Sequence, residues 1–132
     1  MITSSFIDFS DQVSGTRSLF DLNAKDQHRQ IIAESIGFSP KMLAVPEQIH
    51  SPVITCIDTP GTYRAVDGLI TNNPEIILTL NMADCVPLYL YEPNSQIIGL
   101  VHSGWRGTKG GIVFNAIRKM QEMGANGKEV NI

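Results

Sequence analysis

Short apolar segments separated by turn-forming residues make up most of the chain. Apolar side chains at helical spacing predict a helix over residues 24–36. Alternating or continuous apolar runs predict strands over residues 41–45, 52–58, 68–71, 75–80, 86–91 and 96–101. The clearest helix is predicted over residues 108–123, where Thr108 can serve as the N-cap. This order of elements favours an α+β or layered α/β domain.

The final residues, 128–132, look like the opening of one more strand. A strand that begins and is not followed by further sheet favours a fragment, or a chain that a partner completes. We therefore expect one domain over residues 1–132 that is truncated at its C-terminal end. No internal repeat or low-complexity tract divides it.

Composition narrows the possible partners and compartments. The 132 residues are 42% hydrophobic, which excludes a disordered protein. The net charge is -3 and there is no basic stripe, which excludes nucleic acid and anionic lipid as partners. The longest apolar runs have the length of strands, so we expect no membrane span. Residues 1–11 lack the order of a secretory signal. We expect both cysteines to be free thiols in a reducing cytoplasm, with Cys56 in the core.

The first candidate for chemistry is a pair of residues on two consecutive strands. If residues 92–95 form a four-residue turn, the antiparallel ladder pairs Tyr91 with Gln96 and places Cys85 directly opposite His102. Opposed side chains point to the same face, with Cβ atoms about 5 Å apart. Such a pair is either a nucleophile with its base or two ligands of one metal ion. The alternative is a buried structural cysteine beside a hydrogen-bonded histidine.

A glycine-rich segment follows His102 and is a candidate anion site. Gly107, Gly110 and Gly111 allow a close approach of the backbone to a ligand, and the free N–H groups at a helix start favour an anion. Arg106 could add a bidentate clamp for phosphate or carboxylate. The alternative is a tight turn with a solvated arginine and a packed Trp105.

His50 precedes the strand predicted over residues 52–58 and could complete a Cys/His/His set. With an open fourth position this set is the arrangement of a catalytic zinc, although a lone loop histidine is more often an ordinary surface residue. Asp67 and Asp84 stand at strand starts, where each could orient a histidine, act as acid or base, or shape a turn. His28, in the early helix, is expected to face solvent.

Four motifs together resemble those of the YfiH-type proteins, known both as multicopper polyphenol oxidase (laccase) domain proteins and as purine nucleoside phosphorylases. The matching segments are Gln48-Ile49-His50-Ser51, Asp67-Gly68-Leu69-Ile70-Thr71, Ala83-Asp84-Cys85-Val86-Pro87 and His102-Ser103-Gly104-Trp105-Arg106-Gly107. The resemblance covers nearly the whole chain, but only the first half or somewhat more of the family domain. The family's carboxy-terminal portion, which continues the sheet and holds a Gly-Pro loop near the site, is missing.

The resemblance implies a layered α/β/β/α sandwich with mixed β-sheets, incomplete at the C-terminus. His50, Cys85 and His102 fall on the family's three zinc-ligand and active-site positions. The implied activity is phosphorolysis of purine nucleosides (adenosine, inosine, guanosine and methylthioadenosine) to free base and ribose 1-phosphate, together with adenosine deamination. One departure is His28, where the family often has Asn.

The residues around the implied zinc site fit this chemistry. A three-ligand zinc could acidify a water or polarise an oxygen. Asp84 or Asp67 could move a proton. The residues that could hold phosphate are Arg106, Gly107, Gly110 and Gly111.

Three other functions stay open. A copper-dependent polyphenol oxidase would fit the family's older name, but several copper ions need more than the three histidines of this chain. A cysteine hydrolase would use Cys85 as the nucleophile and His102 as the base. A non-catalytic, truncated half-domain would fold poorly or only pair with another chain. A homo-oligomer is a further possibility for the intact fold.

Overall fold

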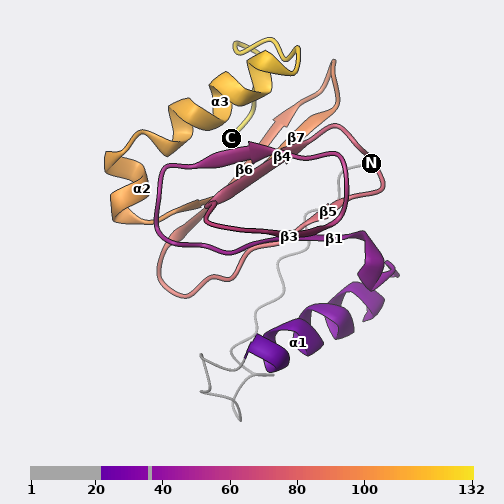
Figure 1. Cartoon of the computed structure of the whole chain (residues 1–132). Coiled ribbons are helices and arrows are strands. Elements are labelled where there is room, and N and C mark those ends of the chain that lie inside the picture. Colours follow the sequence, from indigo (N-terminus) through magenta and orange to yellow (C-terminus); the bar gives the residue numbers. More distant parts are fainter. Residues whose placement is uncertain (1–21, 36) are drawn as a thin grey trace.

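The structure is a computed structural model that describes residues 22–35 and 37–132. Within these residues the strands form two sheets, with the orders β3-β1-β5 and β2-β4-β7-β6 (Figure 1). The three-stranded sheet consists of β1 (Leu43–Pro46), β3 (Gly61–Tyr63) and β5 (Ile77–Leu78). The four-stranded sheet consists of β2 (Ile54–Cys56), β4 (Gly68–Thr71), β6 (Val86–Glu92) and β7 (Ile97–Ser103). The helices are α1 (Leu22–Ser35), the 3-10 helix η1 (Pro40–Met42), α2 (Trp105–Lys109) and α3 (Ile112–Glu122).

The elements stack as layers, and the α/β/β/α arrangement is confirmed. Figure 1 shows α3 on one side of the four-stranded sheet, the three-stranded sheet on its other side, and α1 beyond that. α3 packs against β2, β4 and β7. The four-stranded sheet is mixed, since β2 and β4 are parallel whereas β7 runs antiparallel to β4 and β6. The three-stranded sheet is parallel throughout.

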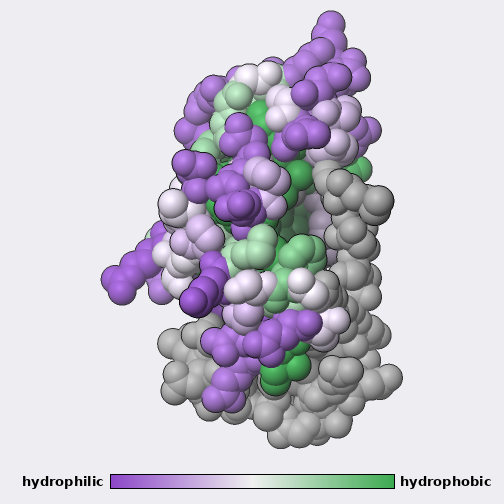
Figure 2. Space-filling model, turned by 90° about the vertical axis from the view of Figure 1, so that its right-hand side faces the viewer, coloured by the Kyte–Doolittle hydropathy of each residue, from purple (hydrophilic) through white to green (hydrophobic). Residues whose placement is uncertain are grey.

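Two apolar clusters hold the layers together. Ile70, Val101 and Met120 belong to the cluster between α3 and the four-stranded sheet. Ala44 and Leu69 belong to the cluster between the two sheets. Because successive side chains of a strand point to opposite faces, β4 supplies Leu69 to one cluster and Ile70 to the other. Asp67, the residue before β4, is fully buried. Figure 2 shows one side face, where apolar residues gather near the middle and hydrophilic residues lie above them.

The helix predicted over residues 108–123 is in fact two helices, α2 and α3. The break falls at Gly111, the N-cap of α3, whose φ of 78° lies in the left-handed region that glycine adopts without strain. Thr108 is a residue of α2 rather than an N-cap, and its hydroxyl donates to the Gly104 carbonyl at 2.9 Å. The apolar stripe is confirmed in α3, whose buried residues are Ile112, Ala116 and Met120.

The β6–β7 hairpin turns one residue later than predicted. Glu92 pairs with Ile97, so residues 93–96 form the four-residue turn. The Glu92 side chain is 1% exposed, and its carboxylate accepts hydrogen bonds from backbone and side-chain groups of Asn94 and Ser95. These bonds tie Glu92 to the turn and fix the register of the ladder.

Other segments follow the predictions with local differences. The early helix and all the predicted strands are present, several at shorter length, and β3 was not predicted. Residues 41–42 belong to η1 because Ser39 caps it and Pro40 occupies its first turn. Cys56 is exposed, which contradicts the expected core position, because it ends the edge strand β2. Asn131 bridges Tyr91 of β6, in line with the strand pattern at residues 128–132.

Two further expectations concern the helices. The side chain of His28 lies outside the described part of the structure, so its expected exposure stays a prediction. None of the described helices is long and apolar enough to cross a membrane.

Candidate metal centre

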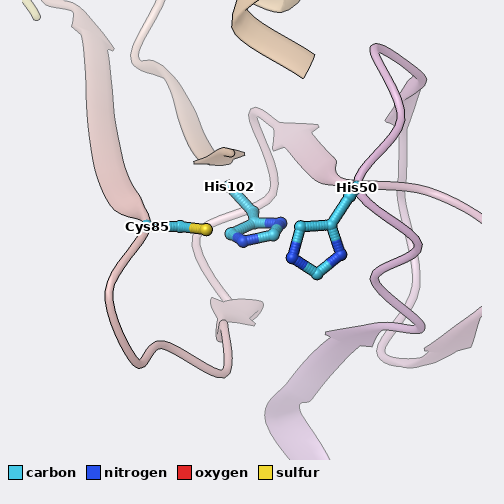
Figure 3. Close-up of side chains that lie close together, drawn as sticks. All are labelled: His50, Cys85 and His102. Atoms are coloured by element: carbon cyan, nitrogen blue, oxygen red, sulfur yellow. The ribbon is translucent and has the colours of Figure 1, made fainter. Parts of the chain in front are cut away.

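His50, Cys85 and His102 come from three separate segments and converge at one place (Figure 3). His50 lies in the loop between β1 and β2, Cys85 immediately precedes β6, and His102 lies near the end of β7. The ligand atoms of the three side chains all lie within 4.8 Å of one another. In Figure 3 the Cys85 sulfur is directed at the His102 ring, and the His50 ring lies on the other side of that ring. The two imidazoles meet edge to face, with centroids 4.7 Å apart.

The β6–β7 ladder brings Cys85 and His102 together through a different register from the predicted one. Pro87, not Cys85, lies opposite His102, so the predicted direct pairing is wrong by two residues. Side chains alternate between faces with a period of two, and a shift of two residues therefore keeps Cys85 on the same face as His102. The predicted proximity of thiol and imidazole is confirmed, although the pairing is not.

Asp67 holds the loop that carries His50. Its carboxylate accepts hydrogen bonds from the backbone N–H groups of Ile49, His50 and Ser51, at 3.3, 2.9 and 2.7 Å. The Ser51 hydroxyl donates a fourth hydrogen bond at 2.7 Å. His50 itself has a φ of 61°, an uncommon conformation for a residue other than glycine. The loop is thus wrapped around one buried carboxylate.

Asp67 also contacts His102. Its Oδ1 lies 2.8 Å from His102 Nδ1, and its backbone carbonyl accepts the His102 N–H at 2.7 Å. Burial acts to raise the pKa of Asp67, but the hydrogen bonds from His102, Ser51 and His50 outweigh burial, so that pKa lies below its usual value. Of the three roles that the sequence allowed for Asp67, its hydrogen bonds fit the orientation of a histidine, here His102.

The thiol of Cys85 lies in negatively charged surroundings. Burial and the carboxylates of Asp84 and Asp67 raise the pKa of Cys85, and Asp84 Oδ1 lies 3.8 Å from the sulfur. A reactive cysteine nucleophile needs the opposite, because positive neighbours lower the pKa of such a thiol. A bound cation would hold the sulfur as a thiolate. The electrostatics of the site therefore favour a metal ligand over a bare nucleophile.

The three side chains could hold one metal ion. A Cβ on Gly104 would lie 3.0 Å from His50 Cδ2, 3.3 Å from the Cys85 sulfur and 3.7 Å from His102 Cε1, so the glycine leaves room beside every ligand. Ligand atoms at about 2.0–2.3 Å from a tetrahedral zinc lie about 3.3–3.8 Å from one another. The atoms of this group, all within 4.8 Å, reach that spacing with side-chain movements of about 1 Å.

The residues predicted to bind phosphate lie next to this centre in the chain. Arg106 is exposed, and its guanidinium lies 5.2 Å from the ring centroid of Trp105. Trp105 is 70% exposed, which contradicts the alternative of a packed tryptophan. Asp84, the predicted acid or base, is also exposed. Their contacts with a substrate stay predictions.

The three glycines have structural roles, two in packing and one in backbone conformation. A Cβ on Gly107 would lie 3.0 Å from the Ser51 carbonyl oxygen, and one on Gly110 would lie 3.0 Å from the Pro52 ring. Glycine at both positions therefore lets α2 lie directly against the loop that carries His50. Gly111 instead supplies the left-handed N-cap of α3. Their binding of phosphate stays a prediction.

Ser51 contacts Asp67 and Gly104 lies against the candidate ligands, but neither was among the predicted site residues. Ser51 donates two hydrogen bonds to Asp67, and Gly104 lies against all three candidate ligands. Within the quoted motifs, Ser51 follows His50 directly and Gly104 lies two residues after His102. This closeness in the sequence was the only local indication of their roles, because the contacts themselves join segments that are far apart in the chain.

The family profile described as multi-copper polyphenol oxidoreductase laccase matches residues 15–132. The chain belongs to this family. Among its relatives, a protein of Corynebacterium glutamicum named purine nucleoside phosphorylase is 37% identical over 115 residues, covering 84% of this chain and 47% of that protein. A Deinococcus radiodurans protein of the same name is 31% identical over 105 residues, covering 80% of this chain and 41% of that protein.

Solved structures of the family have the same fold. The YfiH protein of Bacillus licheniformis, whose structure was described as that of a hypothetical protein, matches with a TM-score of 0.74 and 26% identity, over 80% of this chain and 44% of that one. YlmD of Geobacillus stearothermophilus matches with a TM-score of 0.73 and 32% identity, over 81% of this chain and 43% of that one. The chain thus spans less than half the length of the relatives that it matches.

Proposed function

We propose that the chain is the metal-binding part of a zinc-dependent purine nucleoside phosphorylase. The proposal rests on the convergence of His50, Cys85 and His102 in a chain whose relatives bear that enzyme's name. The reaction is cleavage of adenosine, inosine, guanosine or methylthioadenosine by phosphate, giving the free base and ribose 1-phosphate. Deamination of adenosine is a second activity of the same site.

The donor set supports zinc rather than several copper ions. One thiolate and two imidazoles with an open fourth position are typical of catalytic zinc. The family description names copper, but several copper ions need many histidine ligands, and the whole chain has 3 histidines. When bound, zinc supplies a Lewis acid and lowers the pKa of a water.

The chain's own residues would bind and orient the reactants. We assign proton transfer to Asp84, which is exposed and whose carboxylate lies 3.8 Å from the Cys85 sulfur. We assign phosphate binding to Arg106, because a planar guanidinium donates two parallel hydrogen bonds to phosphate oxygens. The backbone that would lie beside this phosphate belongs to Gly107, Gly110 and Gly111.

We propose the complete activity only for a site to which a further part of the protein also contributes, because the chain spans less than half of its relatives' length. We propose that residues 1–132 form one domain of the family type and that the rest of the site comes from a further segment or another chain, including a second copy. Cys56 and Cys85 are both free thiols, which favours a reducing compartment, and we place the protein in the cytoplasm.

An activity assay tests the proposal. The zinc-loaded protein is incubated with inosine and phosphate, and hypoxanthine release is followed before and after chelation of the metal. Release that requires phosphate and is lost on chelation supports the proposal. Oxygen-dependent oxidation of a phenol by the copper-loaded protein, without release of base, contradicts it. A protein that binds zinc and releases no base would contradict catalysis by residues 1–132 alone, and it would leave either a non-catalytic half-domain or a site that needs the further segment.

Replacement of Arg106 tests the phosphate assignment. Arg106→Ala should raise the KM for phosphate by about tenfold to a hundredfold, because a hydrogen bond to a charged group contributes about 1.5–3 kcal/mol. Lys128→Ala is the matched control, since Lys128 is an exposed cation in the C-terminal segment and outside the proposed site. An Arg106→Ala enzyme with the phosphate KM of the control would refute the assignment.

A further inference from the structure

We propose that Asp67 is the positioning residue that prepares both histidines for a metal ion, by fixing the His50 loop and the tautomer of His102. This inference rests on the metal-binding part of the proposed function and does not depend on the substrate. The carboxylate is 0% exposed and lies between the two histidines in the hydrogen-bond network, so one side chain serves two ligands.

The first role concerns the loop. Three consecutive N–H groups, from Ile49, His50 and Ser51, donate to the two oxygens of Asp67. Successive N–H groups that point to one anion form a concave nest, and a residue in the left-handed region is a usual part of it. His50, with a φ of 61°, is that residue. The carboxylate therefore stabilises the backbone conformation from which the His50 side chain reaches the other ligands.

The second role concerns the imidazole of His102. A carboxylate only accepts hydrogen bonds, so the 2.8 Å contact with Asp67 Oδ1 requires the hydrogen on His102 Nδ1. A neutral imidazole carries one ring hydrogen, and Nε2 is then left with its lone pair free. Only that nitrogen can bind the metal. Asp67 thus selects the tautomer of His102 that can act as a ligand.

The backbone holds Asp67 so firmly that these roles need no metal. Its N–H donates to the Val53 carbonyl at 2.9 Å, and its carbonyl accepts from the His102 N–H at 2.7 Å. Since the side chain is fully buried, water cannot replace the hydrogen bonds that it makes. We therefore infer that His102 has its ligand tautomer before metal binds.

Asp67→Asn distinguishes a positioning role of Asp67 from a role in packing alone. The amide has the same shape as the carboxylate, but it donates hydrogen bonds through its nitrogen. An amide nitrogen in place of Oδ2 would meet the N–H groups of Ile49 and Ser51, whereas in place of Oδ1 it would meet the N–H of His50 alone, so the amide oxygen takes the Oδ2 side and one hydrogen bond to the loop is lost. The nitrogen then donates to His102 Nδ1, and the ring hydrogen moves to Nε2. We expect metal-free Asp67→Asn to have the Nε2–H tautomer, with zinc affinity about 10–100-fold below wild type.

The experiment is nitrogen NMR of the imidazole rings in the metal-free protein. His102→Gln assigns the resonances, and zinc affinity is then measured by titration. Ser51→Ala is the matched control: it removes one donor to Oδ2 and leaves Oδ1 untouched, so His102 should keep the Nδ1–H tautomer.

Either of two results overturns the inference. One is an Nε2–H tautomer in the wild-type protein, which needs no variant and so applies even if Asp67→Asn does not fold. The other is a folded Asp67→Asn protein with the wild-type tautomer and the wild-type zinc affinity. A wild-type protein with the Nδ1–H tautomer that binds no zinc would instead contradict the proposed zinc enzyme and leave the positioning role intact.

Discussion

Gly104→Ala tests the geometry of the metal centre with the smallest possible change. Gly104 has a φ of -75° and a ψ of 166°, which alanine adopts without strain. The added Cβ would instead lie 3.0 Å from His50 Cδ2 and 3.3 Å from the Cys85 sulfur. Because atoms in van der Waals contact lie about 3.5–4.0 Å apart, the His50 ring must retreat by about 0.5–1.0 Å and the Cys85 sulfur by about 0.2–0.7 Å.

That displacement is large compared with the tolerance of a metal site. Metal–ligand distances in proteins hold to within about 0.2 Å, so two of three ligands would lose their geometry. We expect zinc affinity to fall at least about tenfold, which corresponds to about 1.4 kcal/mol. The free energy of unfolding of the metal-free protein should fall by at most about 2–3 kcal/mol, because the cost of overpacking, about 1–3 kcal/mol, is offset in part by the lower entropy of the unfolded alanine chain, about 0.4–1 kcal/mol.

Thermal unfolding with and without zinc is the assay. A metal at a hundredfold excess over its Kd stabilises the wild-type fold by about 2.7 kcal/mol, or roughly 10 °C in Tm for a chain of this size. Gly104→Ala should lose at least half of that shift. Gly99→Ala is the control, since its Cβ would meet core side chains of Ile70 and Leu90 at 3.4 Å and no ligand. A full zinc-induced shift in Gly104→Ala would refute the described geometry.

Two predictions concern the fold. Hydrogen bonds from Ser95 and Asn94 lower the pKa of Glu92, so its carboxylate stabilises the fold above the ordinary glutamate pKa of about 4.3, and this contribution disappears as the pH falls through the lower folded-state value. Glu92→Gln should therefore unfold at a lower urea concentration than the wild type at about pH 7, and the gap between the two urea midpoints should be smaller at about pH 3. The same gap at both pH values would contradict this prediction. Met120→Ala, at a fully buried position of α3, should lower the free energy of unfolding by about 2–5 kcal/mol in urea denaturation. Gln121→Ala, at an exposed position, is the control, and equal stability of the two variants would refute the packing of α3 on the sheet.

Local patterns in the sequence were sufficient to predict most elements and the layered class. The hairpin register could not be predicted, because it depends on Glu92, whose carboxylate binds the turn and moves it by one residue. The error shifted the pairing by two, and the period of the strand preserved the face on which Cys85 lies. Cys56 was misplaced because nothing local to its strand indicates that β2 lies at the edge of the sheet.

The candidate ligands could be predicted from residue type, but not the groups that prepare them. Asp67 offered three possible roles in the sequence, and its contacts with residues 49–51 and with His102 join positions separated by up to 35 residues. Gly104 had no predicted role beyond its place in a motif, and its close approach to three side chains follows from the meeting of three segments. Long-range packing of this kind is not encoded in a local pattern.

The most direct test of the metal centre is the metal content of the purified protein, measured by mass spectrometry beside two cysteine variants. We predict about one zinc per chain in the wild type and in Cys56→Ala, whose thiol is exposed and outside the ligand group. Cys85→Ala should lose the zinc, because it removes one of three ligands. Equal zinc in Cys85→Ala and Cys56→Ala, or copper in place of zinc, would contradict the proposed site.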